Sequence, residues 1–280
     1  MPLALAKAAE AEGRQDWLAT LPSTIAALAH RWQLEVGEPF QPGGQTAWVA
    51  PVTQRGNDRV LKILWRHPEA EHEADGLRAW GGDGAVRLFE ADLIDADTTA
   101  MLLERCLPGT TLESLAEPEQ DVIVASLLRR LWREPAPEHP FGSLQSMCER
   151  WASEFEMKEH AMDPGLARNG LSLFRELPGS AEREVLLCTD LHAGNVLSAE
   201  REPWLMIDPK PYVGDPTYDA LQHILNCDWR LGSDPRALVR RMVELLDLDA
   251  DRLLLWVFAR CVIESPDWPG LGRVAMLIAP

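Results

Sequence analysis

One segment near position 190 constrains what this chain can fold into more than any other. An apolar stretch, Val185–Leu187, leads into a polar loop in which Asn195 follows Asp190 by five residues. After a short turn, the apolar run Trp204–Ile207 ends in a second acidic residue, Asp208. An acid and an amide on one loop, followed by a second acid at the end of a strand, predict a base and metal ligands of the kind that phosphoryl transfer requires.

Phosphoryl transfer explains these residue types because the protein must position a hydroxyl, hold Mg²⁺ and neutralise phosphate oxygens. Asp190 is expected to accept the hydroxyl proton, and Gly194 permits a tight loop that turns the Asn195 oxygen toward a cation. Asp208 is expected to chelate Mg²⁺, since this hard cation prefers oxygen ligands. A turn with an Asx cap is the alternative interpretation of the Asp190-to-Asn195 spacing taken alone. The strand that follows, with its terminal Asp208, favours the catalytic interpretation.

A single cation lies in the apolar strand Val60–Leu64, at Lys62. A buried Lys requires a carboxylate partner or an anionic ligand, because an unpaired buried charge is costly. Glu73 is the expected partner, on a predicted helix that reaches Trp80, and Glu71 is the alternative. Lys62 would then also contact nucleotide phosphates, whereas the plainer explanation is an edge-strand Lys that opposes aggregation.

Two further segments carry weaker nucleotide-binding signals. Gly43 and Gly44 lie where a hairpin is expected to cover the phosphates, since glycines let backbone N–H groups approach an anion, although an ordinary hairpin turn has the same composition. Backbone groups at Glu104 and Cys106, where strands give way to helices, are expected to bind an adenine, and a plain edge strand is the alternative. No GxxxxGK[ST] motif occurs, which argues against a P-loop kinase.

Taken together, these motifs resemble the aminoglycoside phosphotransferase family, in particular its branch of streptomycin 6-phosphotransferases and hydroxyurea phosphotransferases. The resemblance extends from about Trp17 to Trp268. Its matching segments are Val60–Ile63, the stretch from His72 through Leu88, Leu102–Arg105, Pro108–Gly109, Asp190–Asn195, Ile207–Pro209, Gly214–Pro216 and Asp219.

The resemblance implies an α+β, bilobal protein-kinase-like fold, with an antiparallel sheet and a helix in the small lobe and a larger, mainly helical lobe. It implies that Asp190 is the catalytic base, that Asn195 and Asp208 bind Mg²⁺, and that Lys62 holds the phosphates of ATP. The family usually has His two residues before the catalytic Asp, where this chain has Cys188. The exchange affects the bracing of the loop, and a Cys there packs as a small apolar group.

Composition fits one enzyme with two lobes, predicted at residues 1–105 and 106–280. A hydrophobic share of 46% argues against disorder, and a net charge of −17 argues against nucleic-acid binding. The acidity would attract a cationic acceptor, although solubility is the simpler explanation. The chain has neither an apolar run long enough to span a membrane nor a basic signal-peptide start, so we expect a cytoplasmic protein.

Several local elements are predicted from periodicity and capping. A helix is expected to begin at Ser23 and to contain Ile25 and Trp32, and another to follow Ser143. Asp215 is expected to cap a helix. The family resemblance implies that Asp219 is structural and steadies the catalytic loop. The cysteines lack CxxC spacing, which favours reduced thiols over a zinc site or a disulfide framework; they are Cys106, Cys148, Cys188, Cys227 and Cys261.

Acceptor recognition is assigned to groups late in the chain. Carboxylates pair with amino or guanidino groups, and an indole covers an apolar or cationic face. Solvated surface is the alternative for each of these residues. The candidates are Asp228, Trp229, Glu264, Asp267 and Trp268.

The sequence therefore predicts an ATP-dependent O-phosphotransferase acting on a small hydroxylated molecule, with streptomycin-like aminoglycosides favoured. Hydroxyurea or another small metabolite is the alternative acceptor. A nucleotide-binding pseudokinase is the alternative of a different class, suggested by Cys188 and opposed by the intact Asp190, Asn195, Asp208 and Lys62. His192, inside the loop, is expected to touch substrate or simply to fill the loop.

Overall fold

The computed structural model describes residues 1–280. The chain divides into two compact units, Met1–Gly109 and Thr110–Pro280. The predicted division after residue 105 falls between a strand that ends at Glu104 and a strand that starts at Pro108. The α+β class is confirmed, because the first unit is built on an antiparallel sheet and the second is mainly helical.

The first unit contains a five-stranded antiparallel sheet and three helices. In spatial order the strands are β1 (Leu34–Val36), β2 (Ala47–Gln54), β3 (Asn57–Trp65), β5 (Thr98–Glu104) and β4 (Leu88–Asp95). The helices are α1 (Leu3–Ala11), α2 (Gln15–Trp32) and α3 (Glu73–Trp80).

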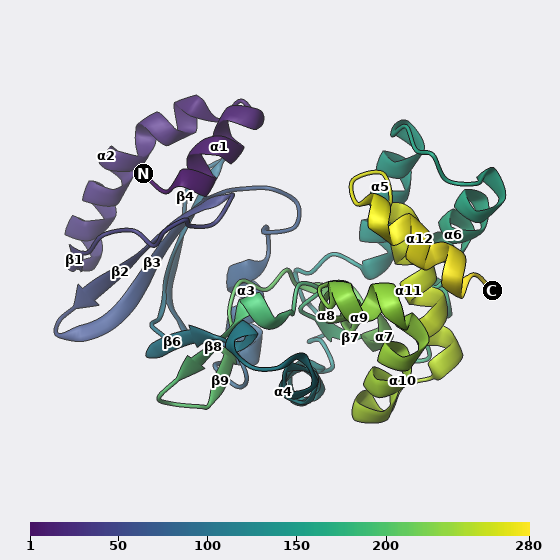
Figure 1. The fold of residues 1–280 in the computed structure, drawn as a ribbon. Helices are drawn as coiled ribbons and strands as arrows, with labels where there is room; N and C mark the ends of the chain where they lie inside the picture. Colours follow the sequence, from purple (N-terminus) through teal and green to yellow (C-terminus); the bar gives the residue numbers. More distant parts are fainter. The chain divides into compact units, whose positions relative to one another are not determined.

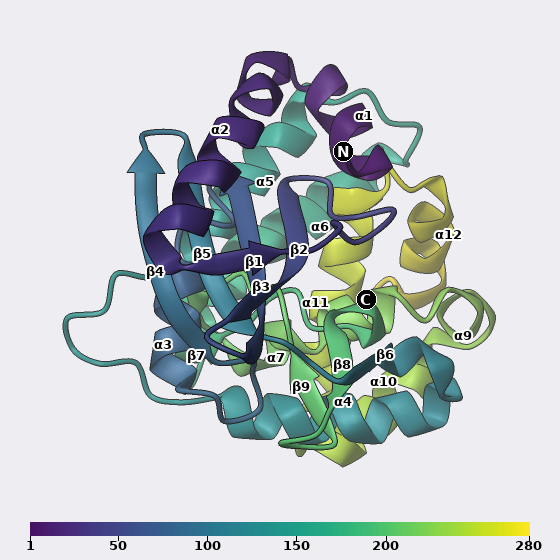
Figure 2. The same ribbon diagram turned by 90° about the vertical axis from the view of Figure 1, so that its left-hand side faces the viewer.

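Strand alternation decides which side chains of this sheet meet the N-terminal helices. Leu61 and Ile63 on β3 belong to the apolar core that also contains Leu21 and Leu28 of α2, and α1 and α2 lie along this face of the sheet (Figure 1, Figure 2). Because successive side chains on a strand point to opposite faces, Lys62 is directed to the other face.

The predicted start of a helix at Ser23 is wrong. α2 begins at Gln15 and continues through Pro22. Ser23 donates its hydroxyl back to the Thr20 carbonyl at 2.7 Å instead of capping a new helix. Burial of Trp17 and other apolar residues on both sides of the proline holds the two halves in one helix, a tertiary gain that offsets the lost backbone hydrogen bond.

The second unit combines short strands with helices, and β6 (Pro108–Thr111) lies at its boundary. The strands are β7 (Val185–Leu187), β8 (Val196–Ala199), β9 (Trp204–Met206) and β10 (Tyr212–Gly214). The α-helices are α4 (Glu117–Leu131), α5 (Leu144–Met157), α6 (Pro164–Glu176), α7 (Pro216–Asp219), α8 (Leu221–Leu225), α9 (Asp228–Ser233), α10 (Pro235–Leu246), α11 (Ala250–Glu264) and α12 (Pro269–Ile278). Single 3₁₀ turns are η1 (Leu112–Ser114), η2 (Pro178–Ser180) and η3 (Ala193–Asn195).

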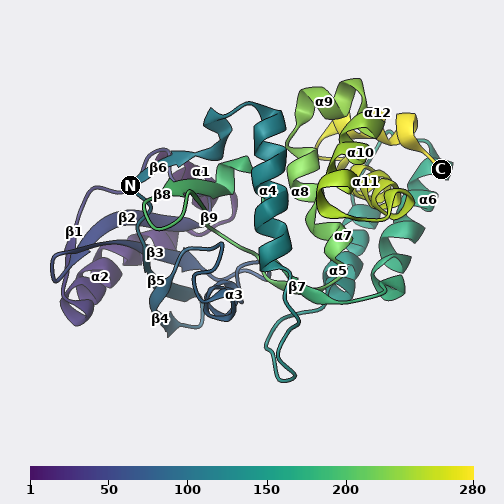
Figure 3. The ribbon, with the colours of Figure 1, turned by 90° about the horizontal axis from the view of Figure 1, so that it is seen from below.

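Helix α11 forms the centre of this unit. Its residues from Trp256 to Ile263 are all buried, and α6, α10 and α12 pack around it (Figure 3). Gly170 of α6 allows the close approach, since a Cβ there would lie 2.5 Å from the side chain of Val262.

Two predicted helix starts are confirmed. Ser143 caps α5 by accepting a hydrogen bond from the Ser146 N–H at 3.1 Å, and Asp215 caps α7 through the Thr217 N–H at 2.9 Å. No helix of the structure combines the length and the apolarity needed to cross a membrane.

Candidate active site

The predicted catalytic loop turns back on itself as the spacing required. The Asn195 amide nitrogen donates to the Asp190 carbonyl at 3.0 Å and to its carboxylate Oδ2 at 3.2 Å. The 3₁₀ turn η3 closes the loop, with the Asn195 N–H donating to the His192 carbonyl at 2.9 Å. Because the nitrogen of the Asn195 amide makes both contacts with Asp190, its oxygen remains available to a cation.

Asp208 is brought to the same end of the β8–β9 hairpin. Val196 pairs with Met206, and the Ile207 N–H donates to the Asn195 carbonyl at 2.9 Å, one residue before Asp208. Asp208 has a φ of 54°, in the left-handed region. An amide oxygen and a carboxylate on adjacent backbone segments form an oxygen donor set that fits Mg²⁺.

Lys210 was not predicted, although it contacts the proposed base. Its ammonium forms an ion pair with Asp190 Oδ2, its N–H donates to the Cys188 carbonyl at 2.9 Å, and its carbonyl accepts from the Thr189 hydroxyl at 2.6 Å. Strand β10 pairs antiparallel with β7 with Tyr212 opposite Leu187, and continuing this register by two residues places Lys210 opposite Thr189. The sequence offered one usable signal, a lysine two residues after the second acid.

Asp219 braces the catalytic loop from the interior. Its fully buried carboxylate accepts the N–H groups of Cys188 at 3.1 Å and Thr189 at 2.7 Å, and the indole N–H of Trp132 at 3.1 Å. Burial raises the pKa of Asp219, and these hydrogen bonds oppose the rise. Thr189 has a φ of 47°, so the brace holds a backbone conformation that residues other than glycine rarely adopt.

Cys188 occupies the interior beside this brace. The side chain is fully buried, and its thiol donates to Asp219 Oδ2 at 3.4 Å. Burial and the neighbouring Asp219 charge raise the pKa of the thiol well above its usual value. Cys188 therefore remains a neutral group that contacts the brace, and the two backbone N–H donors are the main attachment of the loop.

His192 fills the loop in the structure. Its Nδ1 accepts the Gly194 N–H at 3.2 Å. Burial lowers the pKa of the imidazole, against an opposing effect of the Asp190 charge.

The first unit contains the predicted ion pair between Lys62 and Glu73. Both carboxylate oxygens of Glu73 lie 2.7 Å from Lys62 Nζ, and both side chains are buried. The alternative partner, Glu71, pairs with Arg66 at 2.9 Å on the surface instead. The phase of α3 therefore decides between the two carboxylates, because Glu73 begins the helix and Glu71 precedes it.

The glycines of the predicted phosphate-covering hairpin lie in the segment between β1 and β2. Gly43 has a φ of 80°, and a Cβ there would lie 2.6 Å from the Pro2 side chain, so packing against the N-terminus already requires this glycine. Gly44 leaves ordinary van der Waals space around a Cβ.

The predicted adenine-binding segment lies at the end of β5. The Glu104 N–H donates to the Arg87 carbonyl at 2.8 Å, and Glu104 Oε2 accepts the Arg87 N–H at 2.9 Å. Cys106 is buried just before β6.

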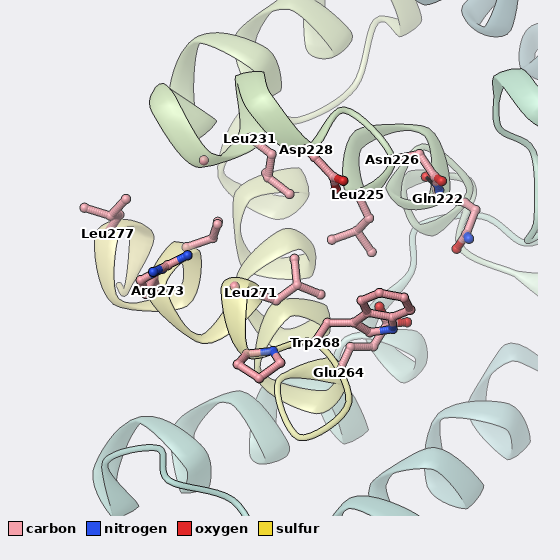
Figure 4. A pocket seen from close by; sticks show the side chains of 14 residues that line it. Gln222, Leu225, Asn226, Asp228, Leu231, Glu264, Trp268, Leu271, Arg273 and Leu277 are labelled. Carbon is pink, nitrogen blue, oxygen red and sulfur yellow. Dashed lines mark hydrogen bonds between the residues drawn. The ribbon is translucent and has the colours of Figure 1, made fainter. Parts of the chain in front are cut away.

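Three of the five predicted acceptor residues, Asp228, Glu264 and Trp268, line one pocket of about 700 Å³ in the second unit (Figure 4). The structure does not bring the other two into it. Trp229 is 78% exposed, and Asp267 forms a surface ion pair with Lys158.

A buried arginine orients the carboxylate of Glu264. Arg260 Nε donates to Glu264 Oε1 at 2.7 Å, and its guanidinium lies 4.2 Å from the Trp151 ring centroid. Arg260 also donates to Gln222 Oε1 at 3.3 Å and to the Tyr218 hydroxyl. The charge of Glu264 is thus offset by Arg260. Asp228 forms no ion pair, although Arg273 also lines the pocket.

The helix that carries Asp228 is tied to α4 by a second buried cluster. Asp121 accepts two hydrogen bonds from Arg230 of α9, at 3.0 and 2.8 Å, and lies 2.9 Å from His223 Nε2. Asp121, His223 and Cys227 could geometrically hold a metal ion. The guanidinium groups of Arg230 and Arg241 on the same carboxylate make the cluster unsuited to a further cation.

Comparisons with known proteins identify the family of this chain. A family model described as aminoglycoside/hydroxyurea antibiotic resistance kinase matches residues 31–269. The chain is 37% identical over 279 residues to streptomycin 6-kinase of Streptomyces griseus, covering 94% of this chain and 88% of that protein. It is 35% identical over 283 residues to hydroxyurea phosphotransferase of Kitasatospora aureofaciens, covering 95% and 78%.

Solved structures share the fold at lower identity. Choline kinase from Streptococcus pneumoniae matches with a TM-score of 0.61 and 12% identity, covering 93% of this chain and 95% of that one. The aminoglycoside phosphotransferase APH(4)-Ia matches with a TM-score of 0.59 and 14% identity, covering 92% and 98%. The predicted protein-kinase-like fold is confirmed. Because the family model and the curated relatives span most of its length, the chain belongs to the aminoglycoside/hydroxyurea antibiotic resistance kinase family and is a phosphotransferase.

Proposed function

We propose that the protein is an ATP-dependent, Mg²⁺-requiring O-phosphotransferase whose acceptor is a cationic aminoglycoside of the streptomycin type, and that it acts in the cytoplasm. The observation that carries the proposal is the loop on which the Asn195 amide nitrogen contacts Asp190 at 3.0 and 3.2 Å while its oxygen stays available. This arrangement separates a base from a metal ligand on one short segment, as in-line transfer requires.

In the proposed reaction, Asp190 orients the acceptor hydroxyl and accepts its proton as the oxygen attacks the γ-phosphorus. Asn195 and Asp208 would hold Mg²⁺, which when bound offsets phosphate charge. Lys62, held by Glu73, would contact nucleotide phosphates with its ammonium, and Gly43, Gly44, Glu104 and Cys106 remain candidate nucleotide contacts.

The acceptor is assigned to the pocket lined by Asp228, Glu264 and Trp268. A volume of about 700 Å³ lies in the range typical of pockets for drug-sized ligands. Asp228, which has no ion-pair partner, suits a guanidino or amino group, and the indole of Trp268 suits an apolar or cationic face.

Hydroxyurea is the second candidate acceptor, favoured by the relative that is 35% identical to this chain. A neutral molecule of a few atoms would leave most of the pocket unfilled, so the pocket volume favours the larger acceptor. A pseudokinase would show no Mg²⁺-dependent consumption of ATP.

Mass spectrometry of streptomycin, other aminoglycosides and hydroxyurea after incubation with the protein and Mg-ATP tests the proposal. We expect one added phosphate on streptomycin with the wild type and with Asp163→Asn, a matched change at the exposed N-cap of α6. Product should be lost with Asp190→Asn, by a factor of about 10²–10⁴, the contribution typical of a general base. Phosphate on hydroxyurea alone would replace the acceptor, and undiminished turnover by Asp190→Asn would remove the assigned base.

A further inference from the structure

The ion pair between Lys210 and Asp190 is not explained by positioning of the base alone. Asp190 is already held by Asn195, and the preceding residues are held by the buried Asp219. Lys210 and Asn195 both contact Oδ2 of Asp190, which leaves Oδ1 for the acceptor hydroxyl. An ammonium beside a carboxylate does not assist proton abstraction, so its presence points to a second task.

The backbone of Lys210 also fixes the residue beside Asp190. The N–H and C=O groups of Lys210 both bond to the catalytic loop, at 2.9 Å with Cys188 and at 2.6 Å with Thr189. The Lys210 side chain is 28% exposed and lies beside an Asp190 side chain that is 14% exposed. A lysine side chain loses rotamer entropy on forming a pair, and the two backbone hydrogen bonds of Lys210 confine this loss to the side chain.

The contact of Lys210 with Asp190 bears on where a reacting phosphoryl group would lie. A hydroxyl bound to Asp190 has to lie about 3–3.5 Å from the phosphorus that it attacks. A long side chain that contacts the same carboxylate can therefore extend to an oxygen of that phosphorus.

We infer that Lys210 is a catalytic residue whose ammonium donates to an oxygen of the transferring phosphoryl group, an inference that rests on the proposed function. As the bond from the acceptor oxygen to the γ-phosphorus forms, the bond from that phosphorus to the bridging oxygen of ADP breaks. The hydroxyl proton passes to Asp190 Oδ1, and Lys210 keeps its own protons while it offsets the charge on the phosphoryl oxygens.

A double-mutant cycle on a transition-state mimic tests this role without an identified acceptor. The wild type, Lys210→Met, Asp190→Asn and the double variant are titrated with ADP and Mg²⁺, with and without aluminium fluoride, by tryptophan fluorescence. We expect Lys210→Met to bind ADP like the wild type and to lose about 100-fold in affinity for the fluoride complex, the loss typical of one removed charge-stabilising donor. The same loss should persist in the Asp190→Asn background, and Lys210→Arg should restore part of it.

Lys158→Met is the matched control, because Lys158 also pairs with an aspartate but on the surface, and it should bind both complexes like the wild type. If the loss disappears in the Asp190→Asn background, Lys210 acts only through Asp190 and the inference is overturned. If Lys210→Met weakens ADP alone to the same extent, the residue has a general structural role and the inference also fails. A wild type that binds no ADP would overturn the proposed function and this inference with it.

Discussion

The proposed catalytic loop and the proposed acceptor pocket lie in the same unit and are built in opposite ways. The loop is held from the interior, where the fully buried Asp219 binds two consecutive N–H groups. The pocket is lined by buried apolar side chains such as Leu231 together with exposed ones, among which Trp268 is 67% exposed.

Because of this difference, the loop and the pocket should tolerate amino-acid substitutions to different degrees. Few side chains can replace the buried Asp219, because each N–H donor left without an acceptor costs free energy. An open pocket can exchange single side chains at small cost, since water replaces the missing contact. We therefore expect mutations of the loop to reduce stability and turnover, and mutations of the pocket to change mainly the acceptor KM.

The largest effect is expected for Asp219→Ala. Three N–H donors, two of them buried, lose their acceptor, at about 1–3 kcal/mol each, so the free energy of unfolding should fall by about 3 kcal/mol in urea denaturation. Turnover should fall about 100-fold, the cost of a small misplacement of a catalytic group. Asp163→Ala is the matched control, because Asp163 also accepts two backbone N–H groups but at an exposed helix start. Equal losses for both variants would remove the contrast between buried and exposed bracing.

A smaller, pH-dependent effect is expected at Asp121, which ties α4 to α9, the helix that carries Asp228. Burial raises the pKa of Asp121, but hydrogen bonds from His223 and Arg230 outweigh it and lower the pKa from 3.8 to about 2. The stability that this carboxylate contributes is present above pH 3.8 and is lost as the pH falls toward 2. The contribution is about 2 kcal/mol, from about 1.4 kcal/mol per pKa unit.

The advantage of the wild type over Asp121→Asn in the free energy of unfolding should therefore shrink by about 2 kcal/mol between pH 5 and pH 2. Denaturant titrations at several pH values measure it. Asp75→Asn, which breaks an exposed pair with Arg78, should show little pH-dependent difference. A constant difference for Asp121→Asn would show that the cluster is not held by its charge.

Asp228→Asn tests whether a mutation in the pocket changes acceptor binding without changing stability. Loss of the Asp228 carboxylate should raise the KM for streptomycin about tenfold, the lower end for a hydrogen bond to a charged group, with kcat and the free energy of unfolding unchanged. Asp267→Asn, three residues after Glu264 but outside the pocket, should leave KM unchanged. A fall in kcat with unchanged KM would assign Asp228 to the reaction and not to binding.

The smallest effect is expected for the two exposed tryptophans. Trp268→Ala should raise the acceptor KM about threefold, since an exposed cation–π contact contributes about 0.5–1 kcal/mol. Trp229→Ala should change nothing in the same kinetic measurement, because its side chain is 78% exposed and does not line the pocket. Equal changes for both residues would mean that the pocket does not hold the acceptor.

The sequence by itself determined which site residues lie together when those residues are close in the chain. Asp190 and Asn195 share one loop, and Asp208 ends the next hairpin, so their proximity follows from local backbone geometry. Lys62 could be predicted for the same reason, since a single cation in an apolar strand requires a partner nearby.

Only the tertiary structure decided the contacts that join distant segments. It selected Glu73 over Glu71 through the start of α3, and it carried α2 through Pro22 by burial against the sheet. It brought Lys210 to Asp190 through the pairing of β10 with β7, and it assembled the pocket from α8, α9, α11 and α12. Such contacts depend on how strands register and helices pack over long separations, and these long-range interactions leave no fixed spacing in the sequence from which they could be read.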